Sequence, residues 1–351
     1  MRPLRNPRCG GHKIPDMAHE RVTIADIARE VGLSVGTVSN ALNRRRPQVS
    51  ERTIEKVVTA ANRLGYRGNS AAAALRTGRY GAVSLHLPES VRSLNFYMEF
   101  TFGVEHAISK ADFDLVLVSS DRKSKTTPVR VDGAIVVDWT PKLHAPRFLH
   151  DAGVPILAAG RQASDLIEST PAQTIWVNYA PMVSQIVTAA AKSGAKRFAM
   201  IAPDDSLRSD WAVSIVDGFN RAVEELELPG QVINIPVTAS PARIIETALS
   251  LCEAETPDCV IFGPQRFAGI AKLHLGWGVP GSNVPYLASC AGDPLSELSD
   301  DALTSISAAP WKFGERCGKS IVEILGGAEF PKMREHRAKI IWGQHWAQPR
   351  H

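Results

Sequence analysis

The sequence predicts two parts, a small all-α domain followed by a larger α/β domain. Apolar residues recur at helical spacing within residues 22–64, which indicates short amphipathic helices. From residue 80 onward, apolar strands alternate with helices, a pattern typical of parallel sheets covered on both faces. The 351 residues suffice for a small domain and a large two-lobed one.

The first predicted helix follows Thr23. Its apolar residues recur at i, i+3, i+4 and i+7, namely Ile24, Ile27, Ala28 and Val31. We expect the Thr23 hydroxyl to cap this helix by accepting a bond from an otherwise unpaired amide. Gly32 suits the left-handed position that ends a helix.

Two further helices complete the small domain. Ser34 is expected to cap the second, whose inward residues are Val38, Ala41 and Leu42. Ser50 is expected to cap the third, with Glu51 in its first turn and a core face of Ile54, Val57, Val58, Ala61 and Leu64. A tight turn between two short helices, followed by a third, is typical of the helix-turn-helix, which places one helix in the major groove of DNA.

The motif V-T-I-x-D-I-A-x-x-x-G-L-S-x-x-T-V-S-x-x-L-N over residues 22–43 resembles the LacI/GalR family of bacterial transcriptional regulators. The resemblance implies that Val35, Gly36 and Asn40 contact base edges. Asn can make paired bonds to adenine, whereas Val can only pack on a thymine methyl group and Gly has no side chain. Direct readout is therefore expected to be modest. The alternative is an ordinary three-helix core, in which Asn40 is merely solvated.

Phosphate contacts and a hinge helix follow from the same resemblance. We expect phosphate contacts from Thr23, Ser34, Thr37, Ser39, Asn43, Arg44, Tyr66, Asn69 and Arg76. Tyr66 could instead be a packing residue. The segment NSAAAALRTG is too short for a stable isolated helix, so it should become helical only when two copies pack over DNA. The resemblance implies that Ala72 and Leu75 then enter the minor groove, with Leu75 as the wedge; the alternative is a plain linker.

Charge is distributed in the way that this reading requires. Residues 1–80 carry 15 Lys/Arg and 6 Asp/Glu, a net charge of +9, and the remaining residues carry 25 and 30, a net charge of −5. The basic part coincides with the predicted DNA-binding domain. Five cysteines lack metal-ligand spacing and suit a reducing cytosol. The sequence predicts no membrane span, no cofactor and no metal site, and the location is expected to be cytoplasmic.

The predicted elements of the large domain alternate along the chain. Strands are expected at 82–87, 115–119, 133–137, 156–159, 175–177, 198–202, 232–235, 259–262 and 286–289, and helices at 182–193, 212–226, 241–253 and 311–325. The family resemblance extends to VDGAIVV at 131–137, GVPIL at 153–157 and KRFAMI at 196–201. It implies a two-lobed periplasmic-binding-protein-like fold.

These patterns give a domain plan with boundaries. Residues 1–20 are expected to be a disordered extension, 21–68 the helix-turn-helix domain, 69–79 the hinge and 80–345 the effector and dimerisation domain. Lobe 1 is expected at about 80–160 and 290–308, and lobe 2 at about 161–289 and 309–345. Crossovers are expected near Gly160, Ser289 and residues 307–309.

Small ligands of such folds bind in the cleft at the carboxyl ends of the strands. Candidate effector contacts there are Phe96, Tyr97, Asp138, Arg161, Asn178, Asp204, Gln265 and Asp293. Phe96 and Tyr97 stand where the family often places aromatic residues that stack on a sugar, although they could simply be core residues.

Three positions depart from the pattern of sugar- and purine-binding relatives. Ile215 replaces an Arg, Pro264-Gln265 replaces Asn-Asp, and Ala291-Gly292 replace a paired-Asp motif. Such polar groups normally reject analogues that lack hydroxyls. The loop 121–131 is also too short for the helix that the family has there. We therefore expect an atypical or larger, less polar ligand; the rival is a regulator with no small-molecule effector.

The function expected from the sequence is a sequence-specific regulator, acting as a repressor. It would bind double-stranded DNA at a pseudo-palindromic operator as a homodimer, with a small molecule in the cleft shifting its affinity. No catalytic motif is present: the sequence has no phosphate-binding glycine loop, no G-x-S-x-G and no H-E-x-x-H. The alternative is a weakly specific architectural DNA-binding protein with a steep salt dependence.

Overall fold

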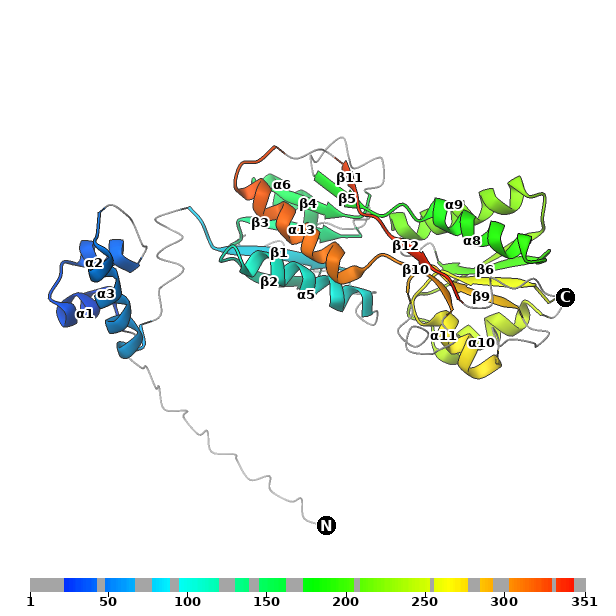
Figure 1. Cartoon of the computed structure of the whole chain (residues 1–351), viewed down its shortest axis with the longest axis horizontal. Coiled ribbons are helices and arrows are strands. Elements are labelled where there is room, and N and C mark those ends of the chain that lie inside the picture. Colours follow the sequence, from blue (N-terminus) through cyan, green and yellow to red (C-terminus); the bar gives the residue numbers. More distant parts are fainter. Residues whose placement is uncertain are drawn as a thin grey trace, which may run out of the picture. The chain divides into compact units, whose positions relative to one another are not determined.

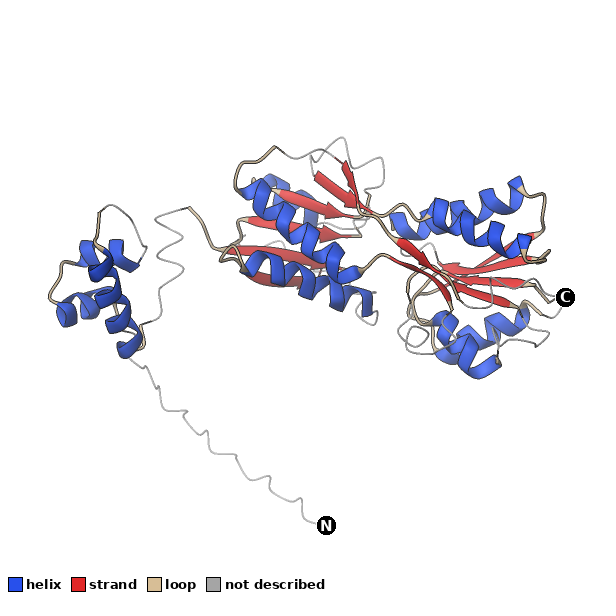
Figure 2. Cartoon of the chain, in the orientation of Figure 1, coloured by secondary structure: helices blue, strands red, loops and turns tan. Residues whose placement is uncertain are grey.

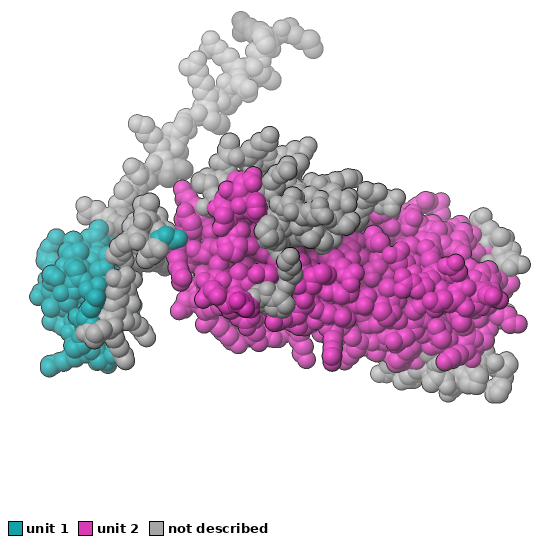
Figure 3. All heavy atoms as spheres, turned by 90° about the horizontal axis from the view of Figure 1, so that it is seen from above, with its two compact units in different colours: residues 1–78 teal, residues 79–351 magenta. Residues whose placement is uncertain are grey.

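The computed structural model describes residues 22–42, 48–66, 78–88, 95–119, 130–138, 145–161, 173–204, 209–252, 256–276, 285–292, 303–329 and 333–343. The chain divides into two compact units, residues 1–78 and 79–351 (Figure 3). Each unit has its own hydrophobic core. Within the described ranges, no helix has the length and apolar character needed to cross a membrane.

The first unit contains three helices, α1 (Ile24–Val31), α2 (Val35–Leu42) and α3 (Glu51–Leu64). Their buried apolar residues form one core, which includes Ile27, Val31, Val38, Ile54 and Val57. Gly32 ends α1 at φ 68° and Gly65 ends α3 at φ 67°, both left-handed. This conformation costs glycine little, which confirms the predicted end of α1.

The caps of the first unit lie at the three predicted residues, Thr23, Ser34 and Ser50. The Ser34 hydroxyl accepts a bond from the Thr37 amide at 3.1 Å, and the Ser50 hydroxyl accepts one from the Thr53 amide at 3.3 Å. Thr23 is the N-cap of α1, as predicted, and forms a capping box with Asp26 at the third helical position. Its hydroxyl donates to the Asp26 carboxylate at 2.7 Å, and its amide donates to the same oxygen at 2.9 Å. The Asp26 side chain is an ionised carboxylate, and such a group accepts stronger hydrogen bonds than a neutral oxygen does.

The second unit contains two six-stranded sheets, one in each lobe (Figures 1 and 2). The lobe 1 sheet has the order β11-β5-β4-β3-β1-β2, and its described neighbouring strands pair in parallel. Its strands are β1 (Ala82–Leu87), β2 (Asp114–Ser119), β3 (Gly133–Val137), β4 (Ile156–Ala159), β5 (Gln173–Trp176) and β11 (Met333–Glu335). Helices α5 (Asn95–Ser109) and α13 (Pro310–Leu325) pack together beside this sheet, and α6 (Ala145–Asp151) contacts β4.

The lobe 2 sheet has the order β12-β10-β9-β8-β6-β7. Its strands are β6 (Phe198–Pro203), β7 (Gly230–Ile235), β8 (Cys259–Phe262), β9 (Tyr286–Ser289), β10 (Thr304–Ser307) and β12 (Lys339–Ile341), of which β12 is antiparallel to β10. Helices α8 (Ala180–Lys192) and α9 (Asp210–Glu225) cover one face, and α10 (Pro241–Ser250) and α11 (Phe267–Leu275) cover the other (Figure 1).

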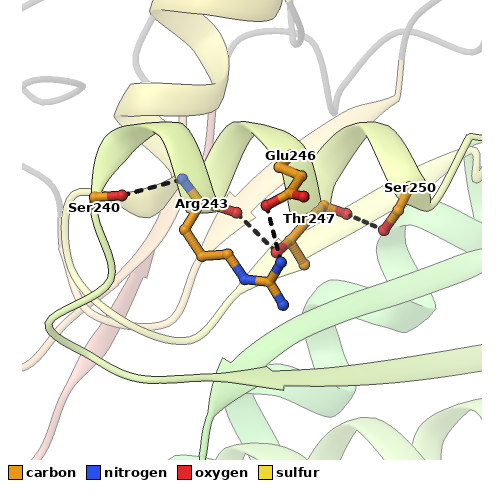
Figure 4. Close-up of polar contacts among 5 residues, drawn as sticks. All are labelled: Ser240, Arg243, Glu246, Thr247 and Ser250. Atoms are coloured by element: carbon orange, nitrogen blue, oxygen red, sulfur yellow. Dashed lines mark hydrogen bonds and ion pairs between the residues drawn. The ribbon is translucent and has the colours of Figure 1, made fainter.

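Helix α10 illustrates how local polar contacts set an element (Figure 4). The Ser240 hydroxyl accepts a bond from the Arg243 amide at 3.3 Å, and Pro241 occupies the first helical position. Proline is tolerated there because its missing N–H would have no partner within the helix. Arg243 and Glu246 pair at 2.9 Å, and Thr247 and Ser250 donate their hydroxyls to backbone carbonyls. The predicted extension of this helix to residue 253 is too long.

The strands were located well by the sequence, but the lobe boundaries were not. The chain remains in lobe 1 past Gly160, because β5 pairs with β4. It remains in lobe 2 past Ser289, because β10 pairs with β9, and α13 returns to lobe 1 against α5. The chain therefore crosses after β5, after β10 and between β11 and β12. Apolar periodicity identifies a strand but not its neighbour in the sheet.

Candidate functional site: a helix-turn-helix and an interlobe cleft

The exposed face of α2 carries the predicted base-reading residues. Val35 is 52% exposed, Gly36 is exposed and Asn40 is half-buried, whereas Val38 and Ala41 on the opposite face are fully buried. An added Cβ at Gly36 would have only the Ser34 hydroxyl within 4 Å, so this position is open. The surface of α2 thus presents the side-chain amide of Asn40, the small apolar side chain of Val35 and an open position at Gly36.

Contacts among the three helices hold α2 in place. Lys56 of α3 donates to the Val31 carbonyl at the end of α1, at 3.0 Å, where a cation also favours the helix dipole. Arg63 of α3 pairs with Glu30 of α1. Tyr66 is half-buried and packs against the core, so the packing role left open by the sequence is present.

The hydroxyl groups predicted to meet phosphate lie on the surface of this unit. Ser34 is exposed, Thr37 and Ser39 are half-buried, and the Ser34 and Thr37 hydroxyls lie 2.9 Å apart. Thr23 is bonded to Asp26, and these two bonds hold the pKa of Asp26 below its usual value. Six further predicted contacts lie outside the described residues: Asn43, Arg44, Asn69, Ala72, Leu75 and Arg76.

A cleft opens within the second unit, at the carboxyl ends of the strands of both lobes. Its cavity volume is about 50 Å³, room for a few water molecules. Most of its surface is apolar, and five of its side chains are aromatic. The lining residues are Phe96, Tyr97, Val137, Asp138, Ala159, Gly160, Val177, Tyr179, Asp210, Trp211, Gln265, Ala291 and Phe313.

Asp138 is the most unusual group in this cleft. It follows β3 at a left-handed φ of 48°, is 8% exposed, and accepts a hydrogen bond from the Tyr97 hydroxyl. Burial, together with the nearby Asp210 carboxylate, raises the pKa of Asp138 to about 6, although the bond from Tyr97 opposes the shift. A left-handed aspartate at the end of a strand is a strained position that favours a functional role.

Asp210 and Trp211 face Asp138 from the start of α9. Burial raises the pKa of Asp210, while the charge and backbone amide of Arg161 lower it. The Arg161 amide donates to Asp210 at 3.4 Å, and its guanidinium lies 3.3 Å from the centre of the Trp176 ring. The Trp211 indole nitrogen is buried without a hydrogen-bond partner among the described residues.

Gln265 joins the two lobes across the cleft. Its carbonyl oxygen accepts a bond from the Phe96 amide at the start of α5, at 3.1 Å, and its amide nitrogen donates to the Gly292 carbonyl at 2.8 Å. Helix N-termini leave amides without intrahelical partners, so this glutamine caps α5 from the opposite lobe. Both ends of its side chain are already committed to the protein.

The DNA-binding unit matches a family model described as bacterial regulatory proteins, lacI family, over residues 23–69. The catabolite control protein A of Priestia megaterium is 29% identical over 291 residues, which cover 79% of this chain and 84% of that protein. The Escherichia coli regulator RafR is 32% identical over 152 residues, or 40% of this chain and 44% of that protein. The DNA-binding unit thus matches the lacI family model, and the chain is similar to LacI-family regulators over most of its length.

Solved structures of LacI-family proteins share the whole fold. The Lac repressor dimer bound to operator and an anti-inducer aligns with a TM-score of 0.75 and 17% identity, covering 93% of this chain and 99% of that one. The regulator CelR in complex with cellobiose aligns with a TM-score of 0.61 and 21% identity, covering 92% and 99%. At these identities the likeness establishes the fold: a helix-turn-helix domain followed by a two-lobed α/β domain.

Four of the eight predicted effector residues line the cleft: Phe96, Tyr97, Asp138 and Gln265. Arg161 adjoins it through Asp210, whereas Asn178 and Asp204 do not line it and Asp293 lies outside the described residues. The sequence analysis missed Tyr179, Asp210, Trp211 and Phe313. For Asp210 and Trp211, the available signal in the sequence was the adjacent acidic and aromatic residues at the start of α9.

Ile215 explains one departure from the family pattern. It is fully buried, and an added Cβ at Gly263 would lie 2.7 Å from its Cδ1 atom. The side chain therefore fills space between α9 and the end of β8. Ile215 is therefore a core residue and is not among the residues that line the cleft.

Proposed function

We propose that this protein is a cytoplasmic transcriptional repressor that binds a pseudo-palindromic operator as a homodimer and responds to a small molecule in the interlobe cleft. The observation that carries the DNA-binding part is the exposed face of α2, held by a capped three-helix core that matches the lacI family model. The cleft at the strand ends supports the effector part.

An apolar surface on lobe 1 supports the homodimer. Met98 and Phe102, one turn apart on α5, are 60% and 59% exposed. Val116 and Leu117 on the neighbouring edge strand β2 are 41% and 62% exposed. An exposed, apolar edge strand is normally covered, because its unpaired backbone groups and side chains favour association. We assign a second copy of the chain as its cover.

The experiment that tests the DNA-binding proposal is selection and sequencing of random DNA fragments bound by the purified protein at near-physiological salt. Recovery of one palindromic motif is the expected result. Tight binding at low salt with no recovered motif would contradict it and favour an architectural role, since that binding depends on phosphate charge alone.

Asn40 should supply part of the sequence specificity. Replacing Asn40 with Ala should weaken binding to the selected operator by roughly 30-fold or more, because the dimer loses one paired base contact of about 1–3 kcal/mol in each half-site, and should relax the preference at one position in each half-site. Fluorescence anisotropy on operator and random duplexes measures both effects. Asn62, exposed on α3, provides the matched control: Asn62→Ala should bind as the unaltered protein does. Unchanged specificity in Asn40→Ala would refute the base contact.

Leu75 should act as a minor-groove wedge when two hinge segments meet at the operator centre. Leu75→Ala should weaken operator binding by about tenfold or more, because the kinked DNA loses the side chain that holds it open. Nonspecific binding should be nearly unchanged, and Leu75→Met should retain most of the affinity. Equal losses on operator and random DNA would argue against the wedge. Circular-permutation gel shifts report the accompanying bend.

A further inference from the structure

The interlobe cleft combines aromatic walls with acidic groups. Five of its thirteen lining residues are aromatic, and two are carboxylates, Asp138 and Asp210. Among the described residues that line the cavity, none is Lys, Arg or His. The lining therefore carries negative charge next to polarisable rings, a combination that attracts cations and repels anions.

Among the described residues, no Lys, Arg or His side chain pairs with the buried Asp138 carboxylate. Its side-chain hydrogen bond comes from the neutral Tyr97 hydroxyl, and the described groups that face it are Tyr97 from α5, Tyr179 after β5, and Asp210 and Trp211 from α9. Burying an ionised carboxylate without a cation is costly, and a second carboxylate nearby adds to the cost. A bound cation would offset both terms.

The nearby basic group is already engaged. Arg161 pairs electrostatically with Asp210 and lies against the Trp176 ring, and it is not among the lining residues. It can compensate one carboxylate from outside the cavity, which leaves Asp138 for the ligand. Gln265, the other polar side chain of the lining, is committed at both ends to Phe96 and Gly292.

Backbone geometry keeps the space beside Asp138 open. Gly160, which lines the cavity, has a φ of 107°, and an added Cβ there would lie 3.6 Å from the Asp138 carboxylate. A side chain at this position would cover one oxygen of the carboxylate. The open oxygen, the left-handed turn at Asp138 and the unpartnered Trp211 N–H all occur at the same cavity.

We propose that the effector of this protein is a small organic ammonium ion, held between the aromatic residues of the cleft and the carboxylate of Asp138. The proposal rests on the proposed function of the cleft as the effector site. A neutral sugar would leave the buried charge uncompensated, and an anion would be repelled by two carboxylates.

Calorimetric titration of the full-length protein without DNA tests this assignment. The probes are tetramethylammonium, choline and butylammonium, with 3,3-dimethylbutan-1-ol as the neutral carbon isostere of choline and glucose as a sugar. At least one ammonium probe should bind saturably below about 10 mM, and choline should bind at least tenfold more tightly than its isostere. Equal binding of choline and its isostere, binding of glucose alone, or no ammonium binding would each overturn the proposal.

Variants distinguish the effect of removing the Asp138 charge from an effect on folding. Asp138→Asn should lose the preference for choline over its isostere, while Asp217→Asn, exposed on the same helix as Asp210, should keep it. Asp210→Asn provides a second test if Asp138→Asn does not fold. Since the pKa of Asp138 is raised to about 6, ammonium affinity should fall roughly tenfold between pH 7 and pH 5 and should not do so in Asp138→Asn.

The same titration distinguishes this proposal from the proposed function. Ammonium binding that leaves operator affinity unchanged would support the ligand class and reject the regulatory role of the cleft. A recovered operator motif together with no ammonium binding would retain the DNA-binding function and reject the ligand class. Selection of DNA in the presence and absence of choline gives this second readout.

Discussion

Replacing Phe102 with Asp should convert the protein to a monomer and weaken operator binding by at least about a hundredfold. Phe102 is 59% exposed one turn from Met98 on α5, next to the edge strand β2, whose Val116 and Leu117 are 41% and 62% exposed. A carboxylate buried there against a second copy would have no partner. A monomer binds one half-site and loses the gain in effective concentration that comes from linking two DNA-binding units.

Analytical ultracentrifugation and operator binding together measure this prediction. Val213→Asp is the control, because Val213 is 51% exposed on α9 of lobe 2, outside the proposed dimer surface. That variant should remain dimeric and bind the operator normally. A dimeric Phe102→Asp protein with intact operator affinity would show that the second copy docks elsewhere.

Replacing Gly314 with Ala should destabilise the second unit by about 3 kcal/mol, near the upper end of the cost of overpacking a core. An added Cβ at Gly314 would lie 2.0 Å from the Phe100 carbonyl oxygen, and one at Gly103 would lie 2.0 Å from the Trp311 carbonyl oxygen. The obstructing atoms are backbone, so no side-chain rotation relieves the clash. Helices α5 and α13 would have to separate, and the apolar residues between them would lose their packing.

Differential scanning calorimetry of the full chain measures this effect. The transition of the second unit should fall by several degrees, while that of the helix-turn-helix unit should not move. Gly326→Ala provides a matched control at the end of the same helix, where φ is −78° and the nearest atom to an added Cβ is 3.3 Å away. Equal changes in the two variants would contradict a role for close helix packing at Gly314.

The sequence placed the local features of this protein accurately. Ser34, Ser50 and Gly32 cap or end helices as predicted, and strands β1, β3, β4, β8 and β9 have the predicted bounds. These features depend on a few neighbouring residues, because caps are single hydrogen bonds and buried parallel strands are short apolar runs. The weaker pattern of β11 and β12, which are three residues each and largely half-buried or exposed, gave no such signal.

The composition of the cleft was only half predictable. Phe96, Tyr97 and Asp138 were proposed because aromatic and acidic residues at the starts of helices and ends of strands are typical of ligand sites. Tyr179, Trp211 and Phe313 reach the same cavity from the segment after β5 and from α9 and α13. Their convergence depends on where the chain crosses between the lobes; the crossover predicted near residues 307–309 is confirmed, whereas those predicted near Gly160 and Ser289 were misplaced.

By itself, the sequence determined the family resemblance, the three-helix reader, the alternation of strands and helices and the separation of charge between the two parts. Each of these is written in local spacing or composition. Only the tertiary structure decided which strands share a sheet, why Gly103 and Gly314 must be glycine, and that Asp138 lies buried beside Asp210. These depend on contacts between segments far apart in the chain, and the free energy of a buried charge is set by the groups that tertiary folding brings around it.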